Sequence, residues 1–127
     1  MKRQILLSFI FSLSGALLAT PALAEMCPKD DELKQTRGSY VFENGDAAFV
    51  NVVAEWVSTS VSLDDNARIA GRVACTYSLY DGSGAGRQEI VALVPRTSGA
   101  VLTNPEWDLT RNAASCTRER RLCTWVR

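Results

Sequence analysis

Apolar and polar residues alternate most regularly over residues 72–79. The apolar positions are Val73, Cys75, Tyr77 and Leu79. A two-residue period is typical of a β-strand that buries one face. The glycine-rich segment 81–86 follows, and residues 88–95 form a second apolar run. This pattern predicts a β-hairpin with Cys75 on its buried face.

Residues 47–63 fit two different patterns. The residues that would share a helical face are Phe49, Val52, Val53 and Trp56, and those that would share a strand face are Val50, Val52, Ala54 and Trp56. Four valines within residues 50–57 and a tail rich in serine and threonine follow the β preference of branched side chains. We therefore predict a strand here.

Three shorter strands are predicted where apolar residues adjoin turn signals. They cover residues 39–42 before Asn44-Gly45, residues 100–102 before Asn104-Pro105, and residues 123–127. A short helix is predicted over residues 27–38, because a proline and three acidic residues suit its first turn and a glycine follows its end. The fold class is therefore mainly β: a small antiparallel sheet or sandwich with one short N-terminal helix.

The start of the chain follows a third pattern. A positively charged beginning precedes an apolar stretch over residues 5–19, and Ala-Leu-Ala at residues 22–24 forms a small-x-small cleavage site. Serine and glycine interrupt the stretch, which is shorter than the roughly 20 residues that a membrane span needs. We expect a cleaved secretory signal at residues 1–24, one domain at residues 25–127, and no membrane span.

Glu25 and Met26 separate the cleavage site from Cys27. In a lipoprotein the cysteine would follow the small residues directly, so we do not expect lipidation. The prediction is a soluble protein of the periplasm or the extracellular space, exported by a Sec-type signal.

Charge and composition exclude several function classes. Residues 25–65 hold nine acids and three bases, whereas residues 66–127 hold five acids and nine bases. This distribution gives no continuous basic face, which argues against a nucleic-acid partner. The chain has no histidine, which excludes Ser-His-Asp and Cys-His catalytic arrangements and ordinary imidazole metal sites.

Four cysteines lie in the predicted domain: Cys27, Cys75, Cys116 and Cys123. An even number in a small exported chain indicates two disulfides, which would staple the β-rich fold. Their separations of 48, 41 and 7 residues do not match the close pairs of a zinc site. Three pairings are open. We favour Cys27–Cys75 with Cys116–Cys123, and the second bond then requires a loop or hairpin, because seven residues of helix would hold the cysteines roughly 10 Å apart.

The arrangement of these motifs resembles a family of uncharacterised small exported bacterial proteins. The features that carry the resemblance are Cys27-Pro28, Leu33-Lys34 with Gly38 and Tyr40, Trp56, Val73-Cys75-Tyr77, and the late pair Cys116 and Cys123. Together they cover nearly all of residues 25–127. The resemblance implies a periplasmic or secreted β-rich domain and brings no catalytic residues.

Two aromatic residues are candidates for contact with a partner. Tyr80 lies on the strand face opposite Cys75 and adjoins the glycine-rich segment, and Trp107 adjoins the Asn104-Pro105 turn. Exposed aromatic residues beside loops often contact partners. The alternative, for Trp107 as for the other tryptophans, is a place in the core.

Arginines near the C-terminal end are a further candidate site. They are Arg118, Arg120 and Arg121, with Arg127 close by. Such a cluster would suit an acidic protein surface or anionic components of the cell envelope. The alternative is a solvated turn that balances the acidic half of the chain.

Two pairs of carboxylates are candidates for acid–base chemistry. They are Asp64 with Asp65, and Glu106 with Asp108. Neighbouring carboxylates more often form turns and caps, and a domain of this size rarely builds the cleft that two-carboxylate hydrolysis needs. We therefore predict no catalytic residues, no metal and no cofactor.

The sequence thus favours a small exported protein that binds another protein. The specific hypothesis is an inhibitor or immunity-type protein of the periplasm. The alternatives are a secreted effector or virulence-associated factor, and a small carboxylate-dependent hydrolase.

Overall fold

The computed structural model describes residues 23–45, 52–81 and 87–127. Most of the predicted signal therefore lies outside the described residues, as do residues 46–51 and 82–86. No helix in the described ranges has the length and apolar character needed to cross a bilayer.

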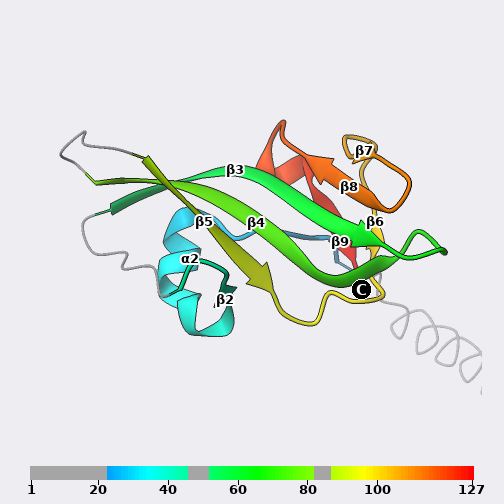
Figure 1. Cartoon of the computed structure of the whole chain (residues 1–127), viewed down its shortest axis with the longest axis horizontal. Coiled ribbons are helices and arrows are strands. Elements are labelled where there is room, and N and C mark those ends of the chain that lie inside the picture. Colours follow the sequence, from blue (N-terminus) through cyan, green and yellow to red (C-terminus); the bar gives the residue numbers. More distant parts are fainter. Residues whose placement is uncertain (1–22, 46–51, 82–86) are drawn as a thin grey trace, which may run out of the picture.

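Two antiparallel sheets dominate the fold (Figure 1), so the predicted mainly β class with one short helix is confirmed. The larger sheet has the order β2-β5-β4-β3-β8-β7, and the smaller has the order β1-β9-β6. The strands of the larger sheet are β2 (Val41–Phe42), β3 (Val52–Leu63), β4 (Ile69–Asp81), β5 (Arg87–Val94), β7 (Asp108–Leu109) and β8 (Ala113–Cys116). The remaining elements are β1 (Glu25–Met26), α2 (Asp30–Thr36), the 3-10 helices η1 (Arg37–Ser39) and η2 (Arg120–Leu122), β6 (Val101–Leu102) and β9 (Thr124–Val126).

The hairpin predicted from the alternating pattern is formed by β4 and β5. Cys75 pairs with Ala92 in the antiparallel register, and all four apolar positions of the pattern are buried. The ambiguous segment before it is a strand over its described part, as predicted. This strand, β3, pairs with β4, and the register shifts between Trp56 and Ser58 and again between Ser60 and Ser62.

One face of the larger sheet carries the core. The Cys27–Cys75 disulfide joins the segment before α2 to the centre of β4, with the two Cα atoms 5.9 Å apart. On the same face the Tyr77 hydroxyl donates a 2.5 Å hydrogen bond to the carbonyl of Pro28. The α2 side chain Leu33 is fully buried against this cluster. The predicted disulfide thus fastens the short acidic helix to the sheet.

The second predicted disulfide, Cys116–Cys123, is also confirmed. Its Cα atoms lie 5.7 Å apart across a separation of seven residues. The chain leaves β8, makes the 3-10 turn η2 and enters β9, so the loop that this bond requires is present. Cys116 lies in the larger sheet and Cys123 just before β9 of the smaller sheet, so the bond ties the two sheets together.

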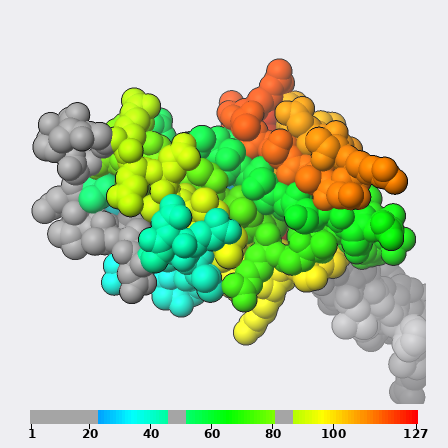
Figure 2. All heavy atoms as spheres, viewed as in Figure 1, coloured from blue at the N-terminus to red at the C-terminus, as the bar shows by residue number. Residues whose placement is uncertain are grey.

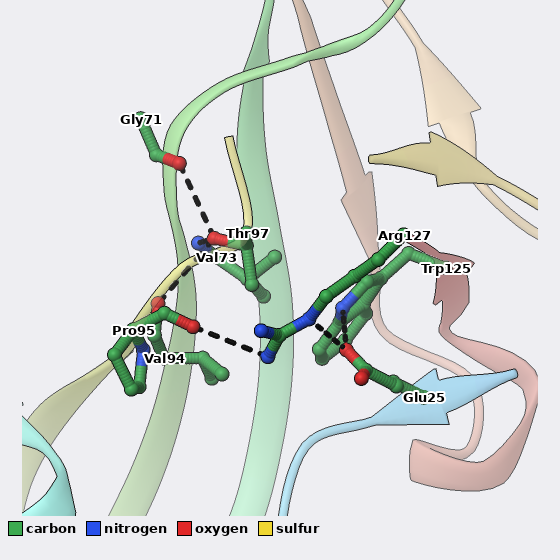
Figure 3. Close-up of polar contacts among 8 residues, drawn as sticks. All are labelled: Glu25, Gly71, Val73, Val94, Pro95, Thr97, Trp125 and Arg127. Atoms are coloured by element: carbon green, nitrogen blue, oxygen red, sulfur yellow. Dashed lines mark hydrogen bonds and ion pairs between the residues drawn. The ribbon is translucent and has the colours of Figure 1, made fainter. Parts of the chain in front are cut away.

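The smaller sheet brings β1 and β9 together across about 100 residues of sequence. The Glu25 carboxylate on β1 accepts hydrogen bonds of 2.8 Å from Trp125 Nε1 and from Arg127 Nε, as Figure 3 shows. Arg127 also donates to the carbonyl of Pro95 at 3.2 Å. Trp125 is only 1% exposed, so this contact fixes a core tryptophan and also joins β1 to Arg127.

The buried side chain of Thr97 makes hydrogen bonds to the backbone at the irregular start of β4. Thr97 Oγ1 accepts a 2.9 Å hydrogen bond from the Val73 amide. Its hydroxyl faces the carbonyls of Gly71 and Val94, at 3.2 and 3.3 Å (Figure 3). Gly71 has a φ of +86°, a backbone conformation that glycine adopts without strain. The hydroxyl thus satisfies backbone groups that the regular ladder leaves unpaired.

Candidate binding surface

Among the described residues, the second face of the larger sheet is open. Here the open face means the cross-strand rows Val53–Tyr80–Arg87, Glu55–Ser78–Glu89 and Ser58–Thr76–Val91. In the described part of the chain, α2 and the segment before it are fastened to the opposite face by the contacts of Cys75 and Tyr77. Figure 2 shows β3, β4 and β5 at the surface of the molecule. Most side chains of these rows are exposed or half-buried, whereas Ser78 at the centre of the middle row is buried.

Tyr80 is held in place on this open face by both neighbouring strands. Its hydroxyl donates a 2.8 Å hydrogen bond to the Glu55 carboxylate on β3. The Arg87 guanidinium on β5 lies over its ring, 4.7 Å from the ring centroid, within the range of a cation–π contact. Val53, the β3 partner of Tyr80, is 61% exposed. An ordered, half-buried aromatic side chain thus lies between an exposed valine and two charged groups.

Trp107 is a core residue, so the alternative stated for it is confirmed. Its side chain is 6% exposed, and its indole Nε1 donates a 3.1 Å hydrogen bond to the carbonyl of Thr124. Trp125 is buried as well. The indole of Trp107 is therefore not available at the surface as the second contact residue that its position beside a turn suggested.

The arginines of the C-terminal stretch have separate partners. Arg118 pairs with Glu106 at 3.0 Å, and Arg121 pairs with Glu119 at 2.6 Å. Both pairs are largely exposed, and such pairs contribute little to stability.

Arg120 has a different role from its neighbours. It is half-buried and donates a 2.7 Å hydrogen bond to the carbonyl of Cys27. It therefore supports the segment held by the Cys27–Cys75 disulfide. Local acidic partners compensate the other two arginines, which weakens the case for an anion-binding cluster.

The carboxylates considered for catalysis mostly have structural partners. Asp64 Oδ1 accepts hydrogen bonds from the amides of Asn66 and Arg68, at 2.9 and 3.0 Å. It therefore closes the turn between β3 and β4. Glu106 pairs with Arg118, and Asp108 lies exposed on the edge strand β7. The two pairs thus serve mainly as turn and surface residues.

All four cysteines are bound in disulfides. Among the described residues, no group of three or more cysteine, aspartate or glutamate side chains is placed to hold a metal ion. The candidate site that we describe is the open face.

Sequence reasoning identified Tyr80 but missed the residues around it. The two-residue period of β4 places Tyr80 on the face opposite Cys75. Val53 and Glu55 could not be assigned to Tyr80, because register shifts between Trp56 and Ser58 and between Ser60 and Ser62 alter the pairing of β3 with β4. The signal that was available is the two-residue period of β3, which places Val53 and Glu55 on one face of that strand.

A scan against protein-family models and searches of curated proteins and solved structures found no match.

Proposed function

We propose that this chain is an exported binding protein whose open face around Tyr80 contacts another protein, in the manner of an inhibitor or immunity-type protein. The observation that carries the proposal is the contact of Tyr80 with Glu55 and Arg87. Tyrosine and arginine are enriched among the residues that dominate protein–protein affinity.

Preorganisation supports this role. A side chain that is already ordered loses less conformational entropy on binding than a free one. The Tyr80 side chain is restrained at two points: its hydroxyl makes a hydrogen bond, and a guanidinium lies over its ring face. The strands that carry these residues are tied into a scaffold with two disulfides. Such a surface suits a partner that docks on a preformed sheet with little rearrangement.

The chemistry of the open face favours a protein over an anionic envelope component. Glu55 and Glu89 accompany Arg87 there, and Val53 adds exposed apolar area. Phosphate-rich surfaces would be repelled by the two glutamates. The two disulfides are consistent with an oxidising, exported environment, which fits a target in the cell envelope or outside the cell.

The test is capture followed by stoichiometry and inhibition. The disulfide-bonded protein is immobilised, exposed to envelope extract, and the retained protein is identified and purified. An inhibitor or immunity-type protein is expected to bind it at 1:1 and to abolish its activity at equimolar concentration. A secreted effector would instead alter its target catalytically or without such a titration end point.

Two variants test whether capture depends on the open face. Tyr80→Ala removes the ordered side chain and is expected to abolish capture. Gln35→Ala, on an exposed residue of α2 on the opposite face of the sheet, is the control and is expected to retain it. Equal capture by both variants would contradict the assignment of the open face.

A further inference from the structure

A cavity of about 460 Å³ lies at the end of β3 remote from Tyr80. The turn between β3 and β4, strand β6, and the turn between β7 and β8 line it. Its apolar lining comes from Leu63, Val101, Leu102 and Leu109. Its volume lies within the range of small-molecule sites, which combine an apolar lining with a few polar groups.

Hydrogen bonds between the three segments fix the walls of this cavity. The Leu63 amide donates to the carbonyl of Asn112 at 2.8 Å, which joins β3 to the turn before β8. The Ile69 amide donates to the carbonyl of Ala100 at 2.8 Å, which joins β4 to the segment entering β6. Asp64 fixes the remaining turn through its two amide contacts. The cavity is therefore preformed.

Apolar side chains at the mouth of the cavity are exposed to solvent. Leu109 is 68% exposed and Val101 is 42% exposed, whereas Leu63 and Leu102 are half-buried. A ligand with apolar groups would cover all four of them, and this burial would favour binding by about 25 cal/mol for each Å² of apolar surface removed from water.

Two side chains of opposite charge complete the lining. Asp65 and Arg111 both border the cavity, and the described part of the chain provides neither side chain with an ion-pair or hydrogen-bonding partner. By contrast, Arg118, Arg121 and Arg127 each pair with a glutamate. The third charged residue, Asp64, is already engaged by two backbone amides.

We propose that this cavity binds a short apolar peptide with free termini, such as a dipeptide. Its carboxylate would pair with the Arg111 guanidinium, its ammonium group with the Asp65 carboxylate, and its side chains would cover Leu63, Leu102 and Leu109. A fatty acid would satisfy only Arg111, and an apolar amine only Asp65. A zwitterion can pair with both. The cavity volume of about 460 Å³ also exceeds the volume of a single amino-acid side chain, which favours a ligand of more than one residue. The site is independent of the open face.

The test is an NMR titration of the isotopically labelled, disulfide-bonded protein with the dipeptide Leu-Leu. We expect saturable shifts of the amides that line the cavity and none at Tyr80. Gly-Gly, which keeps both charges but has no apolar side chain, is expected to produce no saturable shift. N-acetyl-Leu-Leu-amide, which lacks both charges, is expected to bind at least tenfold more weakly. Free leucine tests the size of the ligand and is expected to bind more weakly than Leu-Leu.

Variants of Asp65 and Arg111 test the contribution of each charge to Leu-Leu binding. Asp65→Asn and Arg111→Gln alter exposed side chains, and each is expected to weaken Leu-Leu binding about tenfold, the change expected for one charge-assisted hydrogen bond. Arg72→Gln, on an exposed arginine outside the cavity, is the matched control and is expected to bind normally. The proposal is overturned if Leu-Leu causes no saturable shift at the cavity, if the capped peptide binds equally well, or if free leucine binds as tightly.

Discussion

The hydroxyl of Tyr77 lies 2.5 Å from the carbonyl oxygen of Pro28 and donates a hydrogen bond to it across 49 residues of sequence. Tyr77 is fully buried, and Pro28 follows directly on the disulfide-bonded Cys27. This hydrogen bond and the disulfide therefore both hold residues 27–28 against β4. Tyr77→Phe leaves a buried carbonyl without its donor and is expected to lower the free energy of unfolding by about 1–3 kcal/mol, measured by urea denaturation at neutral pH.

Alkaline pH is expected to destabilise the fold through the same residue. Burial, with a smaller contribution from Tyr40, raises the pKa of Tyr77 well above its ordinary value of 10.0. The unfolded chain therefore loses this proton near pH 10 while the folded chain retains it. The contribution to stability is complete below pH 10 and falls above it, by up to about 1.4 kcal/mol for each pH unit. Tyr77→Phe should show a shallower decline between pH 9 and pH 11, and an identical slope would contradict this explanation.

The two disulfides are expected to contribute unequally to stability. In the chain-entropy description, the bond across 48 residues stabilises by about 4 kcal/mol and the bond across seven residues by about 2 kcal/mol. Replacing both cysteines of each pair by alanine, followed by urea denaturation, measures the two contributions. Intact mass should rise by about 4 Da on reduction of the wild-type protein, because each opened disulfide takes up two hydrogens. No mass change would refute the cross-linked fold.

Thr97 is expected to stabilise the fold through its hydroxyl and not through its volume. Thr97→Val keeps the shape but leaves the Val73 amide without an acceptor, and should cost about 1–3 kcal/mol. Thr97→Ser retains the hydroxyl and is the matched control, with a smaller loss. Hydrogen exchange of the Val73 amide should accelerate in the valine variant only. Equal exchange in both variants would show that the hydroxyl is unimportant.

The parts of the fold that sequence predicted are those with a strong local signal. The alternation in β4 identified its buried face, and valine content selected a strand for β3. By contrast, β8 consists of two alanines, a serine and a cysteine, which carry no apolar period. Its position is decided by pairing with β3 and by the Cys116–Cys123 bond.

The candidate sites also divide into features that a local sequence signal predicts and features that long-range contacts determine. Outward orientation of Tyr80 followed from the period of its own strand. Burial of Trp107 did not follow from its turn, because its indole N–H is satisfied by the carbonyl of Thr124, 17 residues further along the chain. Asp65 and Arg111 likewise line one cavity only because three segments that are separate in the sequence meet there.

The most direct test of the proposed function is the affinity of the captured partner for Tyr80 variants, measured by isothermal titration calorimetry. We predict that Tyr80→Ala weakens binding at least thirtyfold, the loss of about 2 kcal/mol that marks a dominant contact residue. Tyr80→Phe, which removes only the hydrogen bond to Glu55, should weaken it less, and Gln35→Ala on α2 should leave it unchanged. Binding of Tyr80→Ala with wild-type affinity would contradict the account.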